Sequence, residues 1–308
     1  MSKETHRRPA TGVGRLFVEA LRSIFEKEGP TTAGAIAYFS LFSILPAMIL
    51  IITVCEHVLG VFDLRNTVIH KVLEVFPGAR PVILENLSDL ATPSWTVLFI
   101  SLLTFLWSSS WVFMFVESAL NKAWRVTQSR TFWRSRMMAL GMIILCFIML
   151  AGSILLTGTI ASVRAMTYRL NTGIMPESVL SLFWQLVLAI TGFFLNLVVF
   201  TLVYKIVPNT RVRFLEALTG ALVASAFWQL SNYIFAWYTP YFLQHQKLYG
   251  SLGAVIGLLT WVYISTLILL YGAHFSVNMH RLKAIEKRKL AIKLRSTHLR
   301  SALQNVKD

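Results

Sequence analysis

The sequence predicts an all-α, polytopic membrane protein with six transmembrane helices, further amphipathic helices at the membrane interface, and both ends in the cytoplasm. The composition is the first reason, because 56% of the 308 residues are hydrophobic and 14% are charged, whereas soluble domains carry roughly 25% charged residues. Six apolar segments each reach the length of about 20 residues that crosses a bilayer core. The Lys and Arg residues also fall unevenly along the chain.

Residues 1–32 form a cytoplasmic N-terminal segment with one amphipathic helix, predicted at residues 13–27. Its apolar residues recur at helical spacing, with charged residues opposite. The apolar face comprises Leu16, Phe17, Ala20, Leu21, Ile24 and Phe25, and the charged face Arg15, Glu19, Arg22 and Glu26. Such a helix either lies on the cytoplasmic membrane surface or docks under the bundle, and the pattern fits both.

Residues 33–280 form the transmembrane domain. The predicted spans are about 33–60, 95–116, 137–160, 182–207, 215–238 and 249–277. Helices are expected because an open strand would leave backbone groups unpaired in lipid. Pro46 should kink the first span. Small residues that allow close helix packing are Gly220, Gly253 and Gly257.

Two further regions lie outside these spans, one in the first outer loop and one at the C-terminus. The first outer loop, about 61–94, contains two short amphipathic stretches at 66–76 and 81–90, separated by Pro77 and Gly78. They either pack over the bundle, lie on the outer membrane surface or cover a cavity mouth. Residues 281–308 form a basic tail, expected to leave the membrane as a helix and fray in the cytoplasm.

The distribution of Lys and Arg predicts the orientation of the chain in the membrane. Of the 29 Lys and Arg residues, 23 lie in the N-terminal segment, the second-to-third loop, the fourth-to-fifth loop and the tail, and six lie in the opposite loops. Basic residues favour the cytoplasmic side, so both termini are predicted there. The same distribution accounts for the net charge of +15 through topology and attraction to anionic headgroups, so no nucleic acid is expected as a partner.

Ionisable groups in the apolar spans are few and lie near the span ends, where they are expected to be interfacial or capping residues. They are Glu56, His57, Glu117, Glu216 and His274. Uncharged polar residues lie deeper and either join helices or line a translocation path. The candidate path comprises Tyr38, Ser40, Ser109, Asn196 and Asn209. Candidate contacts to anionic headgroups are Lys122, Arg125, Lys205, Arg211 and Arg213.

The sequence contains no catalytic, phosphate-binding or metal-binding motif. Cys55 and Cys146 lie in apolar segments without a paired cysteine or histidine cluster, so no disulfide, metal or cofactor is expected. The protein is accordingly predicted not to be an enzyme.

Four stretches make the chain similar to the YihY/virulence factor BrkB family of bacterial inner-membrane proteins. They are 35–46 (AIAYFSLFSILP); 119–121 with 124–126 and the basic run to Arg136; 204–209 (YKIVPN) with 220–221; and 249–254 (YGSLGA) through 261–263 to 270–273. The resemblance covers nearly the whole chain and implies a six-helix protein of the bacterial inner membrane. His274 stands where the family often has Glu, so a role of that acid is not carried over.

Three functions follow as hypotheses. The first is transport or flipping of an amphipathic or anionic envelope molecule such as a lipid, which the polar spans and the basic inner ends favour. The second is a scaffold without transport that organises the envelope through a second copy of the chain or other envelope proteins. The third is ribonuclease activity, because some family members carry that label. This sequence has no group that would bind a catalytic metal for it.

Overall fold

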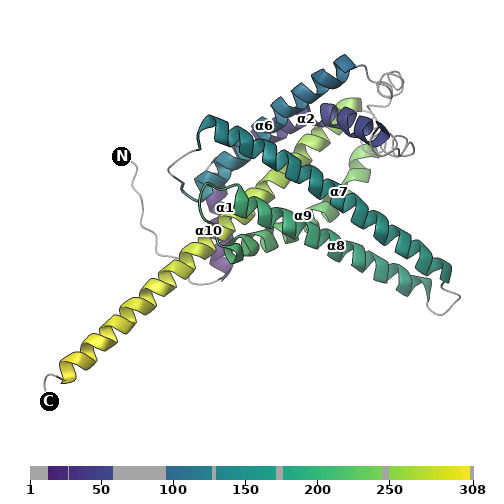
Figure 1. Ribbon diagram of the computed structural model, residues 1–308. Helices are drawn as coiled ribbons and strands as arrows, with labels where there is room; N and C mark the ends of the chain where they lie inside the picture. The colour runs from purple at the N-terminus through teal and green to yellow at the C-terminus, as the bar shows by residue number, and fades with distance from the viewer. Residues whose placement is uncertain are drawn as a thin grey trace.

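The computed structural model describes residues 13–26, 28–57, 95–126, 130–170, 176–244 and 250–305, and these residues form α-helices and short turns without a β-strand. The helices are α1 (Val13–Glu26), α2 (Gly29–His57), α6 (Trp95–Ala123), α7 (Phe132–Leu170), α8 (Glu177–Ile206), α9 (Phe214–Gln244) and α10 (Gly250–Asn305) (Figure 1). The predicted stretches in 61–94 and the side chain of Cys55 lie outside the described residues.

Within the described residues, four helical stretches are long and apolar enough to cross a membrane. They are Trp95–Ala123, Glu177–Ile206, Phe214–Phe235 and Val255–Leu282. Each covers most of one predicted span. The other two predicted spans fall in α2 and α7, which both contain side chains outside the described set. The chain is therefore an all-helical protein with several membrane-spanning candidates, and the number six stays a prediction.

Two helices run further than the apolar pattern indicated. Helix α7 continues to Leu170, beyond the predicted end of the third span near residue 160. Helix α10 continues through the basic tail to Asn305 and extends past the other helices (Figure 1). A helical tail was expected from the sequence, and the Lys, Arg, Leu and Ala residues there have high helix propensity. Helix α2 is continuous across Pro46, the position at which the sequence predicts a kink.

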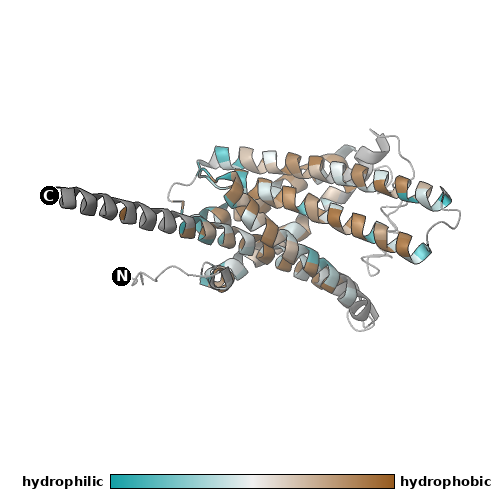
Figure 2. Ribbon diagram, turned by 90° about the horizontal axis from the view of Figure 1, so that it is seen from below, coloured by the Kyte–Doolittle hydropathy of each residue, from teal (hydrophilic) through white to brown (hydrophobic). Residues whose placement is uncertain are grey.

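Helix α10 is the centre of the arrangement. It packs against α9, α2, α1 and α6, while α8 lies against α9, and α7 contacts both α6 and α8. Figure 2 shows hydrophobic residues along the middle of the helices and hydrophilic residues at their ends and turns, as expected for helices that cross a membrane.

The packed core lies at one end of the bundle, where α6 and α8 finish and α9 begins. Its buried residues are Ile36, Val116, Leu120, Met142, Phe200, Val203, Tyr204, Val207, Val212, Ala217, Ala221, Ala224 and Ala273. Toward the other end large apolar side chains are exposed, including Trp95, Leu155 and Leu182. An exposed apolar side chain in such a helix is suited to contact with lipid.

Close packing of α8, α9 and α10 depends on Gly220. A Cβ atom at this position would lie 2.5 Å from the carbonyl oxygen of Gly272 and 2.7 Å from the Cβ of Ser276. The predicted small-residue contact of α9 is thus made with Gly272, while Gly253 and Gly257 lie earlier on α10. The hydroxyl of Tyr204 donates a hydrogen bond of 2.7 Å to the carbonyl of Leu269 at the same junction.

Helix α1 docks on the bundle. Leu16 and Ala20 are buried against Phe275 of α10, and the Tyr271 hydroxyl donates to the carbonyl of Phe17 at 3.2 Å. The sequence left two placements open for this helix, on the membrane surface or docked under the bundle, and in the structure it is docked. Val18, Leu21 and Phe25 nevertheless remain exposed, so the buried stripe is narrower than the predicted apolar face and apolar surface is left for the membrane interface.

Candidate functional site

The basic segments of the sequence meet at the core end of the bundle, which we call the basic end: α1, residues 122–126, residues 130–136, residues 205–213 and residues 271–282 of α10. The backbone N–H of Asn209 donates to Oδ1 of Asn121 at 2.7 Å. The rings of Trp124 and His280 lie 5.8 Å apart. Segments that the charge count assigned to one membrane side therefore lie at one end of the structure.

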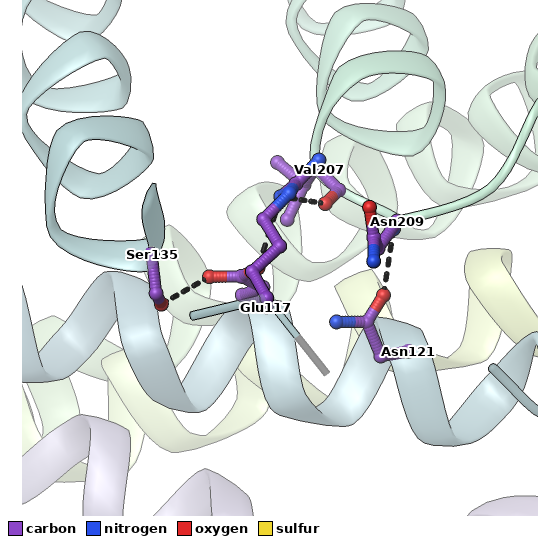
Figure 3. A network of polar contacts seen from close by, with 6 residues as sticks. Glu117, Asn121, Ser135, Val207 and Asn209 are labelled. Atoms are coloured by element: carbon purple, nitrogen blue, oxygen red, sulfur yellow. Dashed lines mark hydrogen bonds and ion pairs between the residues drawn. The ribbon is translucent and has the colours of Figure 1, made fainter. Parts of the chain in front are cut away.

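A buried ion pair joins α6, the turn before α7 and the end of α8 (Figure 3). The side chain of Glu117 is 8% exposed, and its Oε1 lies 2.9 Å from Nη1 of Arg130. Its Oε2 accepts a hydrogen bond of 2.6 Å from Ser135 on α7. Arg130 also donates to the carbonyl of Val207, at the end of α8, at 2.9 Å. Glu117 thus has both oxygens paired, as a buried carboxylate requires, and it fastens α6, α7 and α8 together.

Helix α6 ends at a left-handed backbone position that is occupied by an arginine. Val126 N–H donates to the carbonyl of Asn121 at 2.9 Å and Arg125 N–H to that of Lys122 at 3.2 Å, which is the Schellman pattern of a helix C-terminus. Arg125 occupies the left-handed position with φ of 54°. Glycine is usual there, and a residue with a side chain costs about 1 kcal/mol more.

A second buried carboxylate, Glu216, lies in the first turn of α9. Its side chain is 7% exposed, and Oε1 is 2.7 Å from Nδ1 of His280. Oε2 accepts from the backbone N–H of Arg213 at 3.3 Å, which satisfies one of the unpaired donors at the helix start. The backbone carbonyl of Glu216 accepts a hydrogen bond of 2.6 Å from the hydroxyl of Ser276. The structure thus gives Glu216 a capping role, as the sequence indicated.

The five predicted headgroup cations all lie at the basic end with exposed side chains: Lys122, Arg125, Lys205, Arg211 and Arg213. Lys122, near the end of α6, pairs with Glu28, the residue before α2, at 3.0 Å. The ammonium of Lys205 lies 5.3 Å from the ring centre of Phe214. The basic end therefore presents an accessible positive surface over a rigid polar network.

Of the five predicted path residues, Ser109 lines a cavity in the described part of the chain, and the path as a whole stays a prediction. Ser109 is buried and lines a cavity of about 280 Å³ between α2, α6 and α7, together with Ser43 and Cys146. Tyr38 is exposed, Ser40 and Asn196 are half-buried on α2 and α8, and Asn209 lies in the turn after α8. None of these four is among the residues described as lining that cavity.

Sequence reasoning missed Arg130 and Ser135. Both lie in the basic run that follows α6, and their bonds to Glu117 join residues 13 and 18 positions apart. The available signal was an acid in an apolar helix directly before a cluster of cations. Among the described residues no group of three or more His, Cys, Asp and Glu side chains is gathered to hold a metal ion.

Comparison with known proteins shows the family of this chain. Its sequence matches the virulence factor BrkB family over residues 20–295. It is 25% identical to a UPF0761 membrane protein of Actinobacillus pleuropneumoniae, covering 85% of this chain and 92% of the relative. It is 28% identical to a UPF0761 membrane protein of Aeromonas salmonicida, covering 84% and 87%. No solved structure matches the chain. The chain is a membrane protein that belongs to the virulence factor BrkB family.

Proposed function

We propose that the protein crosses the bacterial inner membrane six times, with both termini cytoplasmic, and that it transports or flips an anionic amphipathic envelope molecule such as a lipid. The observation that carries this proposal is the presence in one structure of an accessible cationic surface at the basic end and a mostly apolar cavity between α2, α6 and α7 that Ser43 and Ser109 also line. A phospholipid has the same two parts, a charged head and apolar chains.

The cationic surface supports the headgroup half of the proposal. Each Lys or Arg near an anionic membrane surface contributes about 1 kcal/mol of attraction. The exposed side chain of Lys205 comes from the last turn of α8, those of Arg211 and Arg213 from the turn between α8 and α9, and that of Arg125 from the turn after α6. Hydrogen bonds from Arg130 to Val207 and from Asn209 to Asn121 bring the backbone segments that carry these cations together.

The cavity between α2, α6 and α7 supports the other half. Its lining is mostly apolar, with Phe105, Val112 and Phe147 among its walls, and Ser43 and Ser109 provide hydroxyls. The Ser109 hydroxyl donates to the carbonyl of Phe105 in its own helix. Such a hydroxyl can turn toward a polar group in lipid surroundings.

The experiment is a lipid-flipping assay with the full chain in proteoliposomes, using a fluorescent anionic phospholipid and its zwitterionic counterpart. We expect faster flipping of the anionic lipid, and a loss when Ser109→Leu is combined with Asn196→Leu. Ser162→Leu, at an exposed position of α7, is the matched control. Wild-type flipping in the double variant would refute the assignment of these residues to a path.

Scaffolding without transport is the second candidate. The observation that favours it is the length of α10, which continues to Asn305 beyond the rest of the bundle and offers a helical surface for a second copy or another envelope protein. Stable partners in a pull-down, together with no flux of any lipid in liposomes, would favour scaffolding over transport. In both cases we propose that the protein is not an enzyme, and RNA cleavage by the purified chain would contradict this.

A further inference from the structure

The cavity between α2, α6 and α7 opens at the side of the bundle, because two of its wall residues on α7, Cys146 and Phe147, are exposed. Its lining is mostly apolar, and a cavity of that kind excludes water and accepts apolar ligands. Its volume of about 280 Å³ is close to the lower limit of small-molecule pockets, about 300 Å³. The cavity therefore has room for part of a lipid, such as one acyl chain.

An aromatic cluster lies on the side of the cavity that faces the basic end. Helix α2 and helix α7 begin at the basic end and α6 finishes there. Phe39 precedes the lining residue Ser43 by one turn of α2, so it lies nearer to the basic end than the cavity does. The ring of Phe39 stacks on that of Trp111 of α6, with the ring centres 5.7 Å apart.

Arg136 of α7 places a positive charge on this cluster. Its guanidinium carbon lies 5.3 Å from the centre of the Trp111 ring. Arg136 precedes the lining residue Ile143 by two helical turns, and the two lie on one stripe of α7 that continues to Phe147. Arg134 is exposed, whereas Arg136 is half-buried. The stripe that forms the α7 wall of the cavity thus carries a cation at its basic end.

The length of this stripe matches one leaflet of a bilayer. Arg136 and Phe147 are 11 positions apart on α7, which is about 16 Å along the helix. The hydrocarbon core is about 30 Å thick, so each leaflet contributes about 15 Å. The rings of Phe105 and Phe147 lie 5.9 Å apart and meet at the far end of the cavity. A lipid with its phosphate at Arg136 would therefore extend one chain along the cavity to these two rings.

We propose that the cavity binds one acyl chain of an anionic phospholipid from the leaflet at the basic end, and that Arg136 binds the phosphate of that lipid. A guanidinium has five N–H donors, so it can donate to phosphate oxygens while it lies over the Trp111 ring. This inference rests on the proposed function for the choice of a lipid and deepens it, because it names the residue that selects an anionic headgroup. It concerns equilibrium binding, which is measured without flipping.

The test is photo-crosslinking in phosphatidylcholine bilayers that contain the full chain. The probe is phosphatidic acid with a diazirine near the end of one acyl chain, and the matched probe is diacylglycerol with the same chain and no phosphate. Mass spectrometry then locates the adducts. We expect phosphatidic acid adducts at Phe105, Cys146 and Phe147. Adducts at Phe194, 58% exposed on α8, report the surrounding lipid and should be equal in all variants.

Arg136→Gln separates recognition of the phosphate from the shape of the cavity. We expect it to lower the phosphatidic acid adducts in the cavity about tenfold, as for the loss of a hydrogen bond between charged groups, and to change the diacylglycerol adducts by less than about twofold. Arg134→Gln removes the neighbouring exposed charge and should change both by less than about twofold, because such a charge is screened. Ala47→Phe fills the cavity from α2 and should lower the adducts of both probes.

Three results would overturn the proposal. The first is an unchanged yield of phosphatidic acid adducts in Arg136→Gln, and the second is an equal loss with both probes in that variant, which would mean that Arg136 only shapes the cavity. The third is displacement of the phosphatidic acid probe by inorganic phosphate, because a site that depends on the acyl chain should not lose its lipid to the free anion. Absence of flipping with the expected crosslinks intact would count against the proposed function alone.

Discussion

Removal of Arg130 tests the buried network most sharply. In the Arg130→Ala variant, Glu117 keeps its hydrogen bond from Ser135 but loses its cation, and the carbonyl of Val207 loses a donor. The side chains of Arg130 and Glu117 are 17% and 8% exposed, so water does not readily replace the missing partner.

The expected loss of unfolding free energy is about 3 kcal/mol. Breaking a buried ion pair by deleting one partner costs about 3–5 kcal/mol, because the remaining charge is left uncompensated. The lower end applies here because Ser135 still donates to the carboxylate. Adding Glu117→Gln to Arg130→Ala removes the buried charge and should recover part of the loss, with a coupling free energy of about 1–3 kcal/mol.

Unfolding in mixed detergent micelles, followed by tryptophan fluorescence, measures these differences. The matched control is Arg22→Ala, which breaks a pair of 2.7 Å with Glu26 whose side chains are 57% and 59% exposed and which should cost about 0.3–0.5 kcal/mol. A loss in Arg130→Ala no larger than in this control would refute the view that the network holds the basic end together.

Two further predictions concern the packing of the core. Gly220→Ala places a Cβ against the backbone of Gly272 and should lower the unfolding free energy by about 1–3 kcal/mol, whereas Gly34→Ala, with open space at its Cβ, should be neutral or stabilising in the same unfolding assay. Tyr204→Phe removes the hydroxyl that donates to Leu269 and should cost about 1 kcal/mol; a thermal midpoint equal to the wild type would contradict a structural role for that bond.

The helices could be predicted because lipid imposes a simple rule. A chain in hydrocarbon must pair its backbone internally, so apolar length alone located Trp95–Ala123 and Glu177–Ile206. Amphipathic spacing located α1, since charged and apolar residues alternate at the helical period. These signals are local and can be read from a single chain.

The polar contacts at the basic end could not be predicted in the same way. The bond between Asn121 and Asn209 joins residues 88 positions apart, and no local pattern specifies which two turns will meet. Glu117 was recognised as an acid near a span end, but its burial depends on α7 and α8 folding back across it. The candidate path stays a prediction, because helix rotation decides which face each residue presents and no local pattern specifies that rotation.

The central claim is that the basic end faces the cytoplasm, and cysteine labelling in intact cells tests it most directly. In a variant without Cys55 and Cys146, single cysteines replace Trp95, 87% exposed at the start of α6, and Ile292, 69% exposed in the tail part of α10. A maleimide that does not cross the inner membrane should label Trp95→Cys in cells with a permeable outer membrane and label Ile292→Cys only after lysis. Labelling of Ile292→Cys before lysis, with Trp95→Cys protected, would contradict the account.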